Sequence, residues 1–414
     1  MRFFRVGGAV RDHFMGIRPQ DVDFVVTGAT EDEFLARKPF STKNFTKVGA
    51  EFPVYLDDRG NEWALARREK KVGAGYHGFT VEFGPEVTIE EDLSRRDLTI
   101  NAMAMEIHDD MKTRIVDVID PFNGRKDIEN KVLRHTSGAF VEDPVRVLRL
   151  ARLRARFGAD WTVAPETVAL VSQMAKKGVL NELTAERVWK ELSRALMEAN
   201  PRLFFDTLLE CDALHVLFPE VYRLKTALEA RRWHPEGDAY EHTMLVLTQA
   251  ALNDGDLEAR MAALVHDFGK GLTPRDQLPK HYGHEMTGVK VAQDFCNRLT
   301  APAKMRDRVM KTTRYHMTGH KMNELSAKGW FKMFTEMDVL RDEPVVGLLH
   351  KVFVCDRRGR LGSENEDVSD LMKVFTKFEQ FKSVRFDSVF DKPWPTDANK
   401  IKEGMMRARV NAMK

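Results

Sequence analysis

The spacing of apolar residues along the chain changes near residue 140. Before that point, short segments rich in β-branched and aromatic residues stand between turn signals, a pattern that predicts strands. These segments are 3–6, 23–28, 52–57, 62–67, 79–83 and 114–119. Beyond residue 141 the apolar residues recur at helical spacing, which predicts helices at 142–158, 184–198 and 201–218. The sequence therefore predicts an α/β head followed by all-α domains.

The length of the chain predicts several domains. At 414 residues it exceeds one ordinary hydrophobic core, and a prior of roughly 100 to 200 residues per domain indicates roughly two to four. Candidate boundaries are a loop at 135–141 and two polar segments with turn-forming residues, 230–238 and 362–367. We therefore expect domains at 1–140, 141–229, 230–360 and 361–414.

Composition excludes several classes of protein. With 43% hydrophobic and 31% charged residues, the chain has the material for cores and a hydrated surface, so extensive disorder is not expected. The 65 basic and 63 acidic residues nearly balance, so any polyanion site must be a local patch. Cys211, Cys296 and Cys355 are far apart and odd in number, which argues against a disulfide framework. Because no apolar run reaches about 18 residues either, we expect a cytoplasmic protein without a membrane span.

A first group of chemically informative residues lies near the N-terminus. Segment 3–6 leads into Gly7-Gly8 and a predicted helix that carries Arg11; backbone amides freed by glycines at a helix start form a cradle for phosphate. Asp21 and Asp23 open the next predicted strand. Residues i and i+2 of a strand point to the same face, so both carboxylates can hold divalent cations side by side.

Paired carboxylates beside a phosphate cradle suit phosphoryl transfer. Cations bridged by the pair can activate a hydroxyl and neutralise charge on the attacked phosphate and the departing pyrophosphate. Glu62, in the predicted strand 62–67, is the candidate for a third carboxylate. Either motif alone is more often an ordinary turn or a solvated pair, but their succession favours a nucleotidyl-transfer site.

Two arginine-rich segments belong with this half of the chain. Segment 90–105 places Arg95, Arg96, Asp97 and Asn101 beside an apolar run that we expect to be helical, where they could hold ribose and phosphate. In the predicted helix 142–158, polar residues one turn apart share a slowly drifting face. They are Asp143, Arg146, Arg149 and Arg152. A solvated, salt-bridged helix surface is the alternative for both segments.

Segments GGAVRD (7–12), DVD (21–23), RRDLTINA (95–102) and EDPVRVLRLARLRARF (142–157) together resemble the class II tRNA nucleotidyltransferases, the CCA-adding enzymes. The resemblance covers nearly the whole chain. It implies a head related to the polymerase-β nucleotidyltransferases, followed by helical neck, body and tail, and addition of C, C and A to the tRNA 3′ end from CTP and ATP. It also implies that Asp21 and Asp23 hold magnesium and that further residues bind the nucleotide: Gly8, Arg11, Arg96, Asp143, Arg146, Arg149 and Arg152.

The choice of bases can be argued from chemistry as well. Cytosine and adenine both present an exocyclic amine next to a ring-nitrogen acceptor, which a carboxylate and a guanidinium can match. Uracil and guanine place a carbonyl where the amine should be. Asp143 and Arg146 therefore form a candidate protein template for C and A. By the resemblance, segment 66–80 is a flexible loop that helps switch from C to A; an exposed hairpin is the alternative.

A second group of candidate residues lies in the helical half. His242, the pair His266-Asp267 and Asp356 lie in separate predicted helices, from which imidazoles and carboxylates can converge on one or two metal ions that activate water. This order resembles the HD-superfamily phosphohydrolases. Other histidines could be additional ligands, phosphate contacts or surface residues: His281, His284 and His316.

An appended HD domain resembles the bacterial multifunctional type of CCA-adding enzyme. That resemblance implies 2′,3′-cyclic phosphodiesterase, 2′-nucleotidase and phosphatase activities for tRNA end repair, and a transition metal such as nickel; imidazole ligands agree with an ion softer than magnesium. A homodimer is compatible with it. Three alternatives stay open: a poly(A)-polymerase-like or A-adding enzyme, an HD phosphohydrolase with a binding-only head, and a non-catalytic tRNA-binding protein.

Overall fold

The structure is a computed structural model that divides into two compact units. It describes residues 1–19, 21–37, 42, 44–48, 53–71, 79–107, 113–253, 255–392 and 394–414. Unit 1 comprises 1–184 and 206–216, and unit 2 comprises 185–205 and 217–414. The units therefore interleave along the sequence. None of the helices formed by the described residues combines the length and apolar character needed to span a bilayer.

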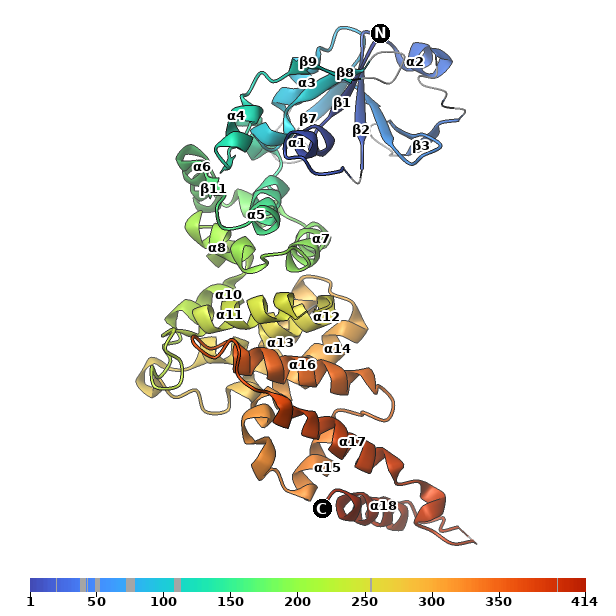
Figure 1. Cartoon of the computed structure of the whole chain (residues 1–414), viewed down its shortest axis with the longest axis vertical. Helices are drawn as coiled ribbons and strands as arrows, with labels where there is room; N and C mark the ends of the chain where they lie inside the picture. Colours follow the sequence, from blue (N-terminus) through green and yellow to red (C-terminus); the bar gives the residue numbers. More distant parts are fainter. Residues whose placement is uncertain are drawn as a thin grey trace. The chain divides into compact units, whose positions relative to one another are not determined.

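Unit 1 is built on a seven-stranded sheet (Figure 1). In spatial order its strands are β3 (Thr46–Val48), β4 (Val54–Leu56), β5 (Glu62–Leu65), β2 (Asp23–Thr27), β1 (Arg2–Val6), β8 (Ala104–Ile107) and β9 (Thr113–Ile119). Only β2 and β5 pair in parallel within this sheet; the other neighbours are antiparallel. Strands β6 (Arg67–Lys71) and β7 (Phe79–Phe83) form a separate hairpin, and β10 (Val132–Leu133) pairs with β11 (Thr162–Val163). All six predicted strands are confirmed.

Apolar clusters cover both faces of the central strands, and successive residues of a strand point to opposite sides. Phe3 and Phe24 pack on one face with Trp63 and the α2 residue Phe34. Phe4 packs on the other face, in a cluster that includes residues of α3. The helices of this unit are α1 (Gly8–Phe14), α2 (Glu31–Arg37), α3 (Ile89–Ser94), η2 (Thr99–Asn101), α4 (Gly124–Glu129), η3 (Gly138–Glu142), α5 (Val145–Phe157), α6 (Pro165–Lys176) and η4 (Val179–Glu182).

The expectation of a helix across the apolar run in 90–105 was wrong. The chain forms α3, then the short η2, and then strand β8. Strand β8 pairs with both β1 and β9, and all of it except Glu106 is buried. A central strand with both faces covered has apolar residues at consecutive positions, so its period of two is hidden in the sequence.

Unit 2 is helical (Figure 1). Its elements are α7 (Ala185–Leu196), α10 (Pro219–Arg223), η5 (Leu224–Thr226), α11 (Ala239–Leu252), α12 (Leu257–Val265), η6 (Phe268–Leu272), η7 (Arg275–Gln277), α13 (His284–Arg298), α14 (Ala303–Tyr315), η8 (His316–Glu324), α15 (Ala327–Glu336), α16 (Pro344–Arg358), η9 (Ser369–Met372), α17 (Lys373–Ser383), η10 (Phe386–Ser388) and α18 (Ala398–Ala412). Helices α8 (Arg202–Glu210) and α9 (Leu214–Leu217) cross the boundaries between the units. The C-terminal helices share a core that includes Trp330, Phe334 and Phe381.

Two candidate active sites

The glycine turn lies where the sequence predicts it, between β1 and α1. Gly7 has φ +68°, a conformation that L side chains rarely adopt. A Cβ at this position would lie 2.9 Å from Nη1 of Arg96 and 3.8 Å from Oδ2 of Asp23. Glycine here therefore keeps backbone, carboxylate and guanidinium close together around a space that a side chain would fill.

The two aspartates do not both lie on the strand. Asp23 is the first residue of β2, whereas Asp21 is an exposed residue at a bend before it, so the prediction that both lie on the strand was wrong. Asp23 and Glu62 are partners in the parallel register of β2 and β5. Burial raises the pKa of both groups, the charge of Arg96 opposes the rise at Asp23, and the charges of Asp23 and Asp21 raise the pKa of Glu62 further.

Carboxylate oxygens of this kind are the ligands that magnesium prefers, and a cation would relieve the repulsion between them. The donor set at Asp21, Asp23 and Glu62 therefore fits the metal that the sequence implies. Among the described residues, however, none of these three carboxylates belongs to a trio whose ligand atoms all lie within 4.8 Å.

A buried hydrogen-bond network connects α1, η2 and α5. Nη1 of Arg11 donates to Asn101 Oδ1 (2.7 Å), and Asn101 Nδ2 donates to Asp97 Oδ1 (3.0 Å). Asp97 also accepts from Nε of Arg149 (2.7 Å). Although burial alone would raise its pKa, the charge of Arg149 and these donors hold the pKa of Asp97 far below its usual value. Three of the predicted nucleotide-site segments thus share one network.

The remaining predicted head residues are engaged locally. Arg96 donates to Asp92 (3.0 Å), Asp143 accepts from the amide of Val145 (3.1 Å), and Arg146 donates to the carbonyl of Ala139. Arg152 lies on α5 and is partly buried. Of the predicted flexible loop at 66–80, residues 72–78 lie outside the described residues, and the described part comprises Ala66, strand β6 and the start of strand β7.

The second site lies in unit 2, where separate elements bring the predicted histidines and aspartates together. His242 is on α11, His266 follows α12, Asp267 precedes η6, and Asp356 is on α16. All four side chains are almost completely buried. Nε2 of His242 lies 3.1 Å from Oδ1 of Asp356, and Nε2 of His266 lies 3.2 Å from Oδ2 of Asp267. Ligand atoms of His242, His266 and Asp356 all lie within 4.8 Å of one another.

A second ligand group shares Asp267. Its Oδ1 atom lies 3.2 Å from Nε2 of His284 and 3.4 Å from Nε2 of His316. Its Oδ2 atom faces His266 and, at 3.6 Å, His242. One carboxylate therefore stands between two sets of imidazoles, an arrangement that can hold one ion or two.

Backbone contacts orient three of these imidazoles alike. Nδ1 of His266, His284 and His316 donates to a carbonyl three residues earlier, at 2.8, 2.7 and 2.7 Å. This fixes the tautomer, so each Nε2 presents a lone pair to the cluster, as metal-ligating histidines do. The Nε2 atoms of His284 and His316 are 3.1 Å apart, and lone pairs this close repel unless a proton or cation lies between them.

Three buried atoms of the cluster lack ordinary hydrogen bonds. Among the described residues, Nε2 of His266 and both oxygens of Asp267 have no hydrogen bond of good geometry, although Oδ2 of Asp267 forms an ion pair with Lys270. Burial alone would raise the pKa of Asp267, but the charges of His266 and Lys270 hold it well below its usual range. Orphaned imidazole and carboxylate atoms facing one another fit a bound divalent ion.

Several residues around the cluster were missed in the sequence analysis. Oε1 of Glu236 accepts from Nδ1 of His242 (3.1 Å) and of His234 (2.9 Å). Burial alone would lower the pKa of His242, but its hydrogen bonds to Asp356 and Glu236 raise that pKa to about 9. His320 reaches Oδ2 of Asp356 (2.8 Å). Buried Lys270 bridges Asp267 (2.7 Å) and Glu229 (2.6 Å). The predicted candidate His281 instead contacts Thr273 and the carbonyl of Leu228.

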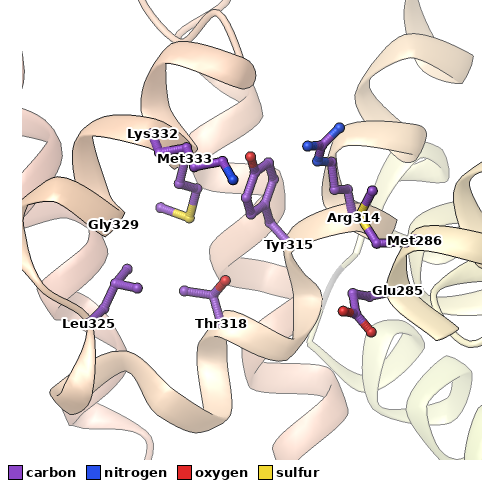
Figure 2. A pocket seen from close by; sticks show the side chains of 9 residues that line it. All are labelled: Glu285, Met286, Arg314, Tyr315, Thr318, Leu325, Gly329, Lys332 and Met333. Atoms are coloured by element: carbon purple, nitrogen blue, oxygen red, sulfur yellow. The ribbon is translucent and has the colours of Figure 1, made fainter. Parts of the chain in front are cut away.

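A pocket of about 260 Å³ lies close to these elements in sequence but is a separate feature. In Figure 2 the ring of Tyr315 stands between Met333 on one side and Arg314 on the other. Its lining comes from α13, α14, η8, α15 and the link between the last two: Glu285, Met286, Arg314, Tyr315, Thr318, Leu325, Gly329, Lys332 and Met333. None of the described cluster histidines lines the pocket. Consecutive residues of a helix point to different faces, so residues that are neighbours in sequence can line different sites.

Family models match three parts of the chain. The poly A polymerase head domain matches residues 3–134, and the HD domain matches 239–360. Between them, residues 160–224 match the model described as "Probable RNA and SrmB- binding site of polymerase A". The order of these matches agrees with the order of the two candidate sites along the chain.

Curated relatives match over nearly their full length. The Multifunctional CCA protein of Burkholderia vietnamiensis is 43% identical over 415 residues, which cover 100% of this chain and 98% of the relative. The protein of the same name from Pseudomonas fluorescens is 47% identical over 367 residues, covering 88% and 87%.

Solved structures share the fold. A CCA-adding enzyme in its apo form II aligns with a TM-score of 0.65 at 21% identity, covering 99% of this chain and 88% of that one. The Thermotoga maritima CCA-adding enzyme complexed with tRNA-CCA aligns with a TM-score of 0.62 at 19% identity, covering 100% and 87%. These likenesses support the order of an α/β head and a helical remainder.

Proposed function

Since this chain belongs to the multifunctional CCA protein family and is a CCA tRNA nucleotidyltransferase, we propose that it adds C, C and A to the tRNA 3′ end from CTP and ATP without a nucleic-acid template, releasing pyrophosphate. The observation that carries this proposal is the position of Asp23 beside both the Gly7 turn and the guanidinium of Arg96. A carboxylate and a guanidinium beside a glycine turn at a helix start suit a triphosphate.

At the head site, Asp21 and Asp23 with Glu62 would hold magnesium, which supplies charge neutralisation at the triphosphate and orients the attacking hydroxyl. Gly7 leaves space for a phosphate to reach the backbone, and Arg96 offers it a guanidinium. Asp97 acts as a positioning residue, because it orients Arg149 directly and Arg11 through Asn101. These roles, and nucleotide contacts by Gly8 and Arg152, are supported by the resemblance of the motifs.

Addition of C before A distinguishes this reaction from its nearest rival. We expect tRNA lacking its CCA end to be extended by two residues with CTP alone, and to reach full length only when ATP is added as well. A poly(A)-polymerase-like or A-adding enzyme would extend the same tRNA with ATP alone and would not incorporate C. Sequencing gels of the labelled 3′ end separate these outcomes.

Asp143 and Arg146 would read the incoming base. A carboxylate that accepts from the exocyclic amine, paired with a guanidinium that donates to the ring nitrogen, admits cytosine and adenine and rejects uracil and guanine. We predict that Asp143→Ala either admits UTP or GTP or abolishes addition. Misincorporation assays with each single nucleotide test this, with Glu142→Ala as the neighbouring control. Unchanged selectivity for CTP and ATP in Asp143→Ala would refute the protein-template role.

For the second site we propose metal-dependent 2′,3′-cyclic phosphodiesterase, 2′-nucleotidase and phosphatase activity on tRNA ends. His242, His266, Asp267 and Asp356 would hold a divalent transition metal such as nickel, which polarises a phosphate and activates water. Glu236 orients His242 through its Nδ1 atom, and Lys270 offsets the negative charge of Asp267. His284 and His316 would complete a second ion position around the shared carboxylate.

Metal content gives a direct test of this centre. We expect purified wild-type protein to retain nickel or another transition metal after dialysis, and His266→Ala to retain none at this site while remaining folded. Elemental analysis of the two proteins, with His350→Ala as a control outside the cluster, makes the comparison. Retention of the same metal by His266→Ala would rule out the proposed ligand set.

The domain limits 1–140, 141–229, 230–360 and 361–414 stay our proposal. The family matches at 3–134 and 239–360 lie within the first and third of these segments, which supports those two. A cytoplasmic location and a homodimer likewise stay predictions.

A further inference from the structure

Exposed aromatic side chains flank the buried metal-ligand cluster. Trp233 is 60% exposed and Tyr282 is 79% exposed. Large aromatic rings lose favourable burial when they stand in water, so two such rings beside one site call for an explanation. Neither ring has a role in the cluster itself.

Short backbone links place both rings at the rim of the cluster. Trp233 directly precedes His234, whose buried ring packs edge-on against the His242 ring at a centroid distance of 4.7 Å. Tyr282 lies two residues before His284, a member of the second ligand group. The two segments are also joined to each other, because His281 contacts the carbonyl of Leu228 at 3.0 Å.

Cations accompany both rings. The guanidinium of Arg232 lies 4.9 Å from the centre of the Trp233 ring, and Nζ of Lys280 lies 5.9 Å from the centre of the Tyr282 ring. Arg231 is exposed next to Arg232. Within the part of the chain that the structure describes, no carboxylate forms an ion pair with Arg231, Arg232 or Lys280. Their positive charge is therefore available to a negatively charged ligand.

We propose that this rim, formed by Trp233, Tyr282, Arg232 and Lys280, binds the unpaired terminal nucleotides of an RNA while its end phosphate enters the hydrolytic centre. Aromatic faces accept stacked bases of any sequence, and nearby cations neutralise the connecting phosphates. A protein partner would use the same apolar area but would not need several unpaired cations beside it, so charge favours RNA. This inference rests on the proposed hydrolytic function and names the residues that select its substrate.

Two substrates separate binding at the rim from chemistry at the cluster. One is a short unstructured oligoribonucleotide that ends in a 2′,3′-cyclic phosphate, and the other is bis(p-nitrophenyl) phosphate, which has no nucleobase. We expect Trp233→Ala and Tyr282→Ala each to raise KM for the oligoribonucleotide about fivefold or more, with little change in kcat. Hydrolysis of bis(p-nitrophenyl) phosphate and addition of CCA should stay at wild-type rates.

Matched variants exclude a merely structural effect. Trp233→Phe keeps an aromatic face and should restore most of the wild-type KM. Trp394→Ala removes another exposed tryptophan, which packs on Phe386, and should not change KM for either substrate. A wild-type KM in the Trp233→Ala, Tyr282→Ala double variant, or an equal loss on both substrates, would overturn the proposal.

A binding measurement tests the rim even if hydrolysis fails. In the presence of a chelator, the same oligoribonucleotide should quench the tryptophan fluorescence of the wild-type protein, and the quenching should weaken in Trp233→Phe and be normal in Trp394→Phe. Wild-type protein that quenches but hydrolyses neither substrate would refute the proposed hydrolytic function and retain the rim. Equal quenching in wild type and Trp233→Phe would refute the rim.

Discussion

Asp97 shows how one buried carboxylate organises a site at the scale of single residues. It accepts hydrogen bonds from the amide of Leu98 (2.8 Å), from Asn101 and from Arg149. None of these three donors is a candidate metal ligand. Hydrogen bonds to a charged group contribute about 1.5–3 kcal/mol each when they are well formed. Asp97 therefore holds together the predicted nucleotide-site segments of α1, η2 and α5. The same hydrogen bonds stabilise unit 1.

We predict a pH dependence from this residue. Because the folded-state pKa of Asp97 lies far below the usual value of 3.8, its contribution to the free energy of unfolding is complete above about pH 4 and is lost as the pH falls below that. Asp97→Asn should be less stable than wild type at pH 7 by about 1–3 kcal/mol and should lose less on acidification. Urea unfolding of the full-length wild-type and Asp97→Asn proteins from pH 7 to pH 3 measures both effects.

An exposed aspartate of the same unit supplies the control. Asp32 lies on α2 and is exposed. Asp32→Asn should therefore follow the wild-type curve from pH 7 to pH 3. If Asp97→Asn follows that curve as well, the network around Asp97 does not contribute to stability in the way proposed.

At the scale of elements, the contact of η6 with α13 determines the geometry of the second site. A Cβ at Gly269 would lie 2.0 Å from the carbonyl oxygen of His284 and 2.7 Å from the amide of Gly288. Neither atom is the end of a flexible side chain, so the two elements would have to separate. Asp267 precedes η6 and His284 opens α13, so this separation would move shared ligands apart.

We predict that Gly269→Ala lowers the stability of unit 2 by about 1–3 kcal/mol, the usual cost of overpacking, and abolishes metal retention. Gly347→Ala is the matched control, because a Cβ there meets nothing within 4 Å and alanine is favoured over glycine inside a helix such as α16. It should be as stable as wild type or slightly more stable. Thermal unfolding and elemental analysis measure both variants, and a metal-replete Gly269→Ala protein would contradict the prediction.

Elements with a clear period could be predicted from the sequence, and others could not. The six predicted strands form, and so does the predicted helix that became α5. Strand β8 was missed because both of its faces are covered, and Asp21 was placed on β2 although the strand begins at Asp23. Strand starts depend on pairing with neighbours, here β1 and β5, which single-sequence patterns do not contain.

The sequence identifies some residues of the second site but not others. His242, His266, Asp267 and Asp356 could be identified because their order resembles a known motif, and the fold brings them together. Glu236 and His320 could not be identified in this way. Glu236 belongs to the turn segment before α11, and it meets His242 only because of the path of that turn. Contacts made by loop residues depend on the tertiary fold and leave no periodic signal.

At the scale of the whole molecule, the two proposed ligand sets belong to different compact units. Asp21 and Asp23 are in unit 1, and His266 and Asp267 are in unit 2. We predict that Asp21→Ala reduces CCA addition to background and leaves the proposed phosphodiester hydrolysis intact, because the proposed ligands of the hydrolytic site are untouched. Asp267→Asn, which is nearly isosteric, should do the reverse. Both assays on each purified variant, with circular dichroism to verify folding, test this division; loss of both activities in folded Asp21→Ala protein would contradict it.

The interleaving of the units affects how the chain can fold during synthesis. Unit 1 is not complete at residue 184, because it also includes 206–216, and 185–205 belong to unit 2. Domains generally fold as they emerge from the ribosome, N-terminal first. Here the head unit lacks its last segment until residue 216 has left the exit tunnel, and by then the first helix of the second unit, α7, is already outside without its partners. A nascent chain halted between 184 and 205 should therefore be more sensitive to protease than one halted well beyond 216.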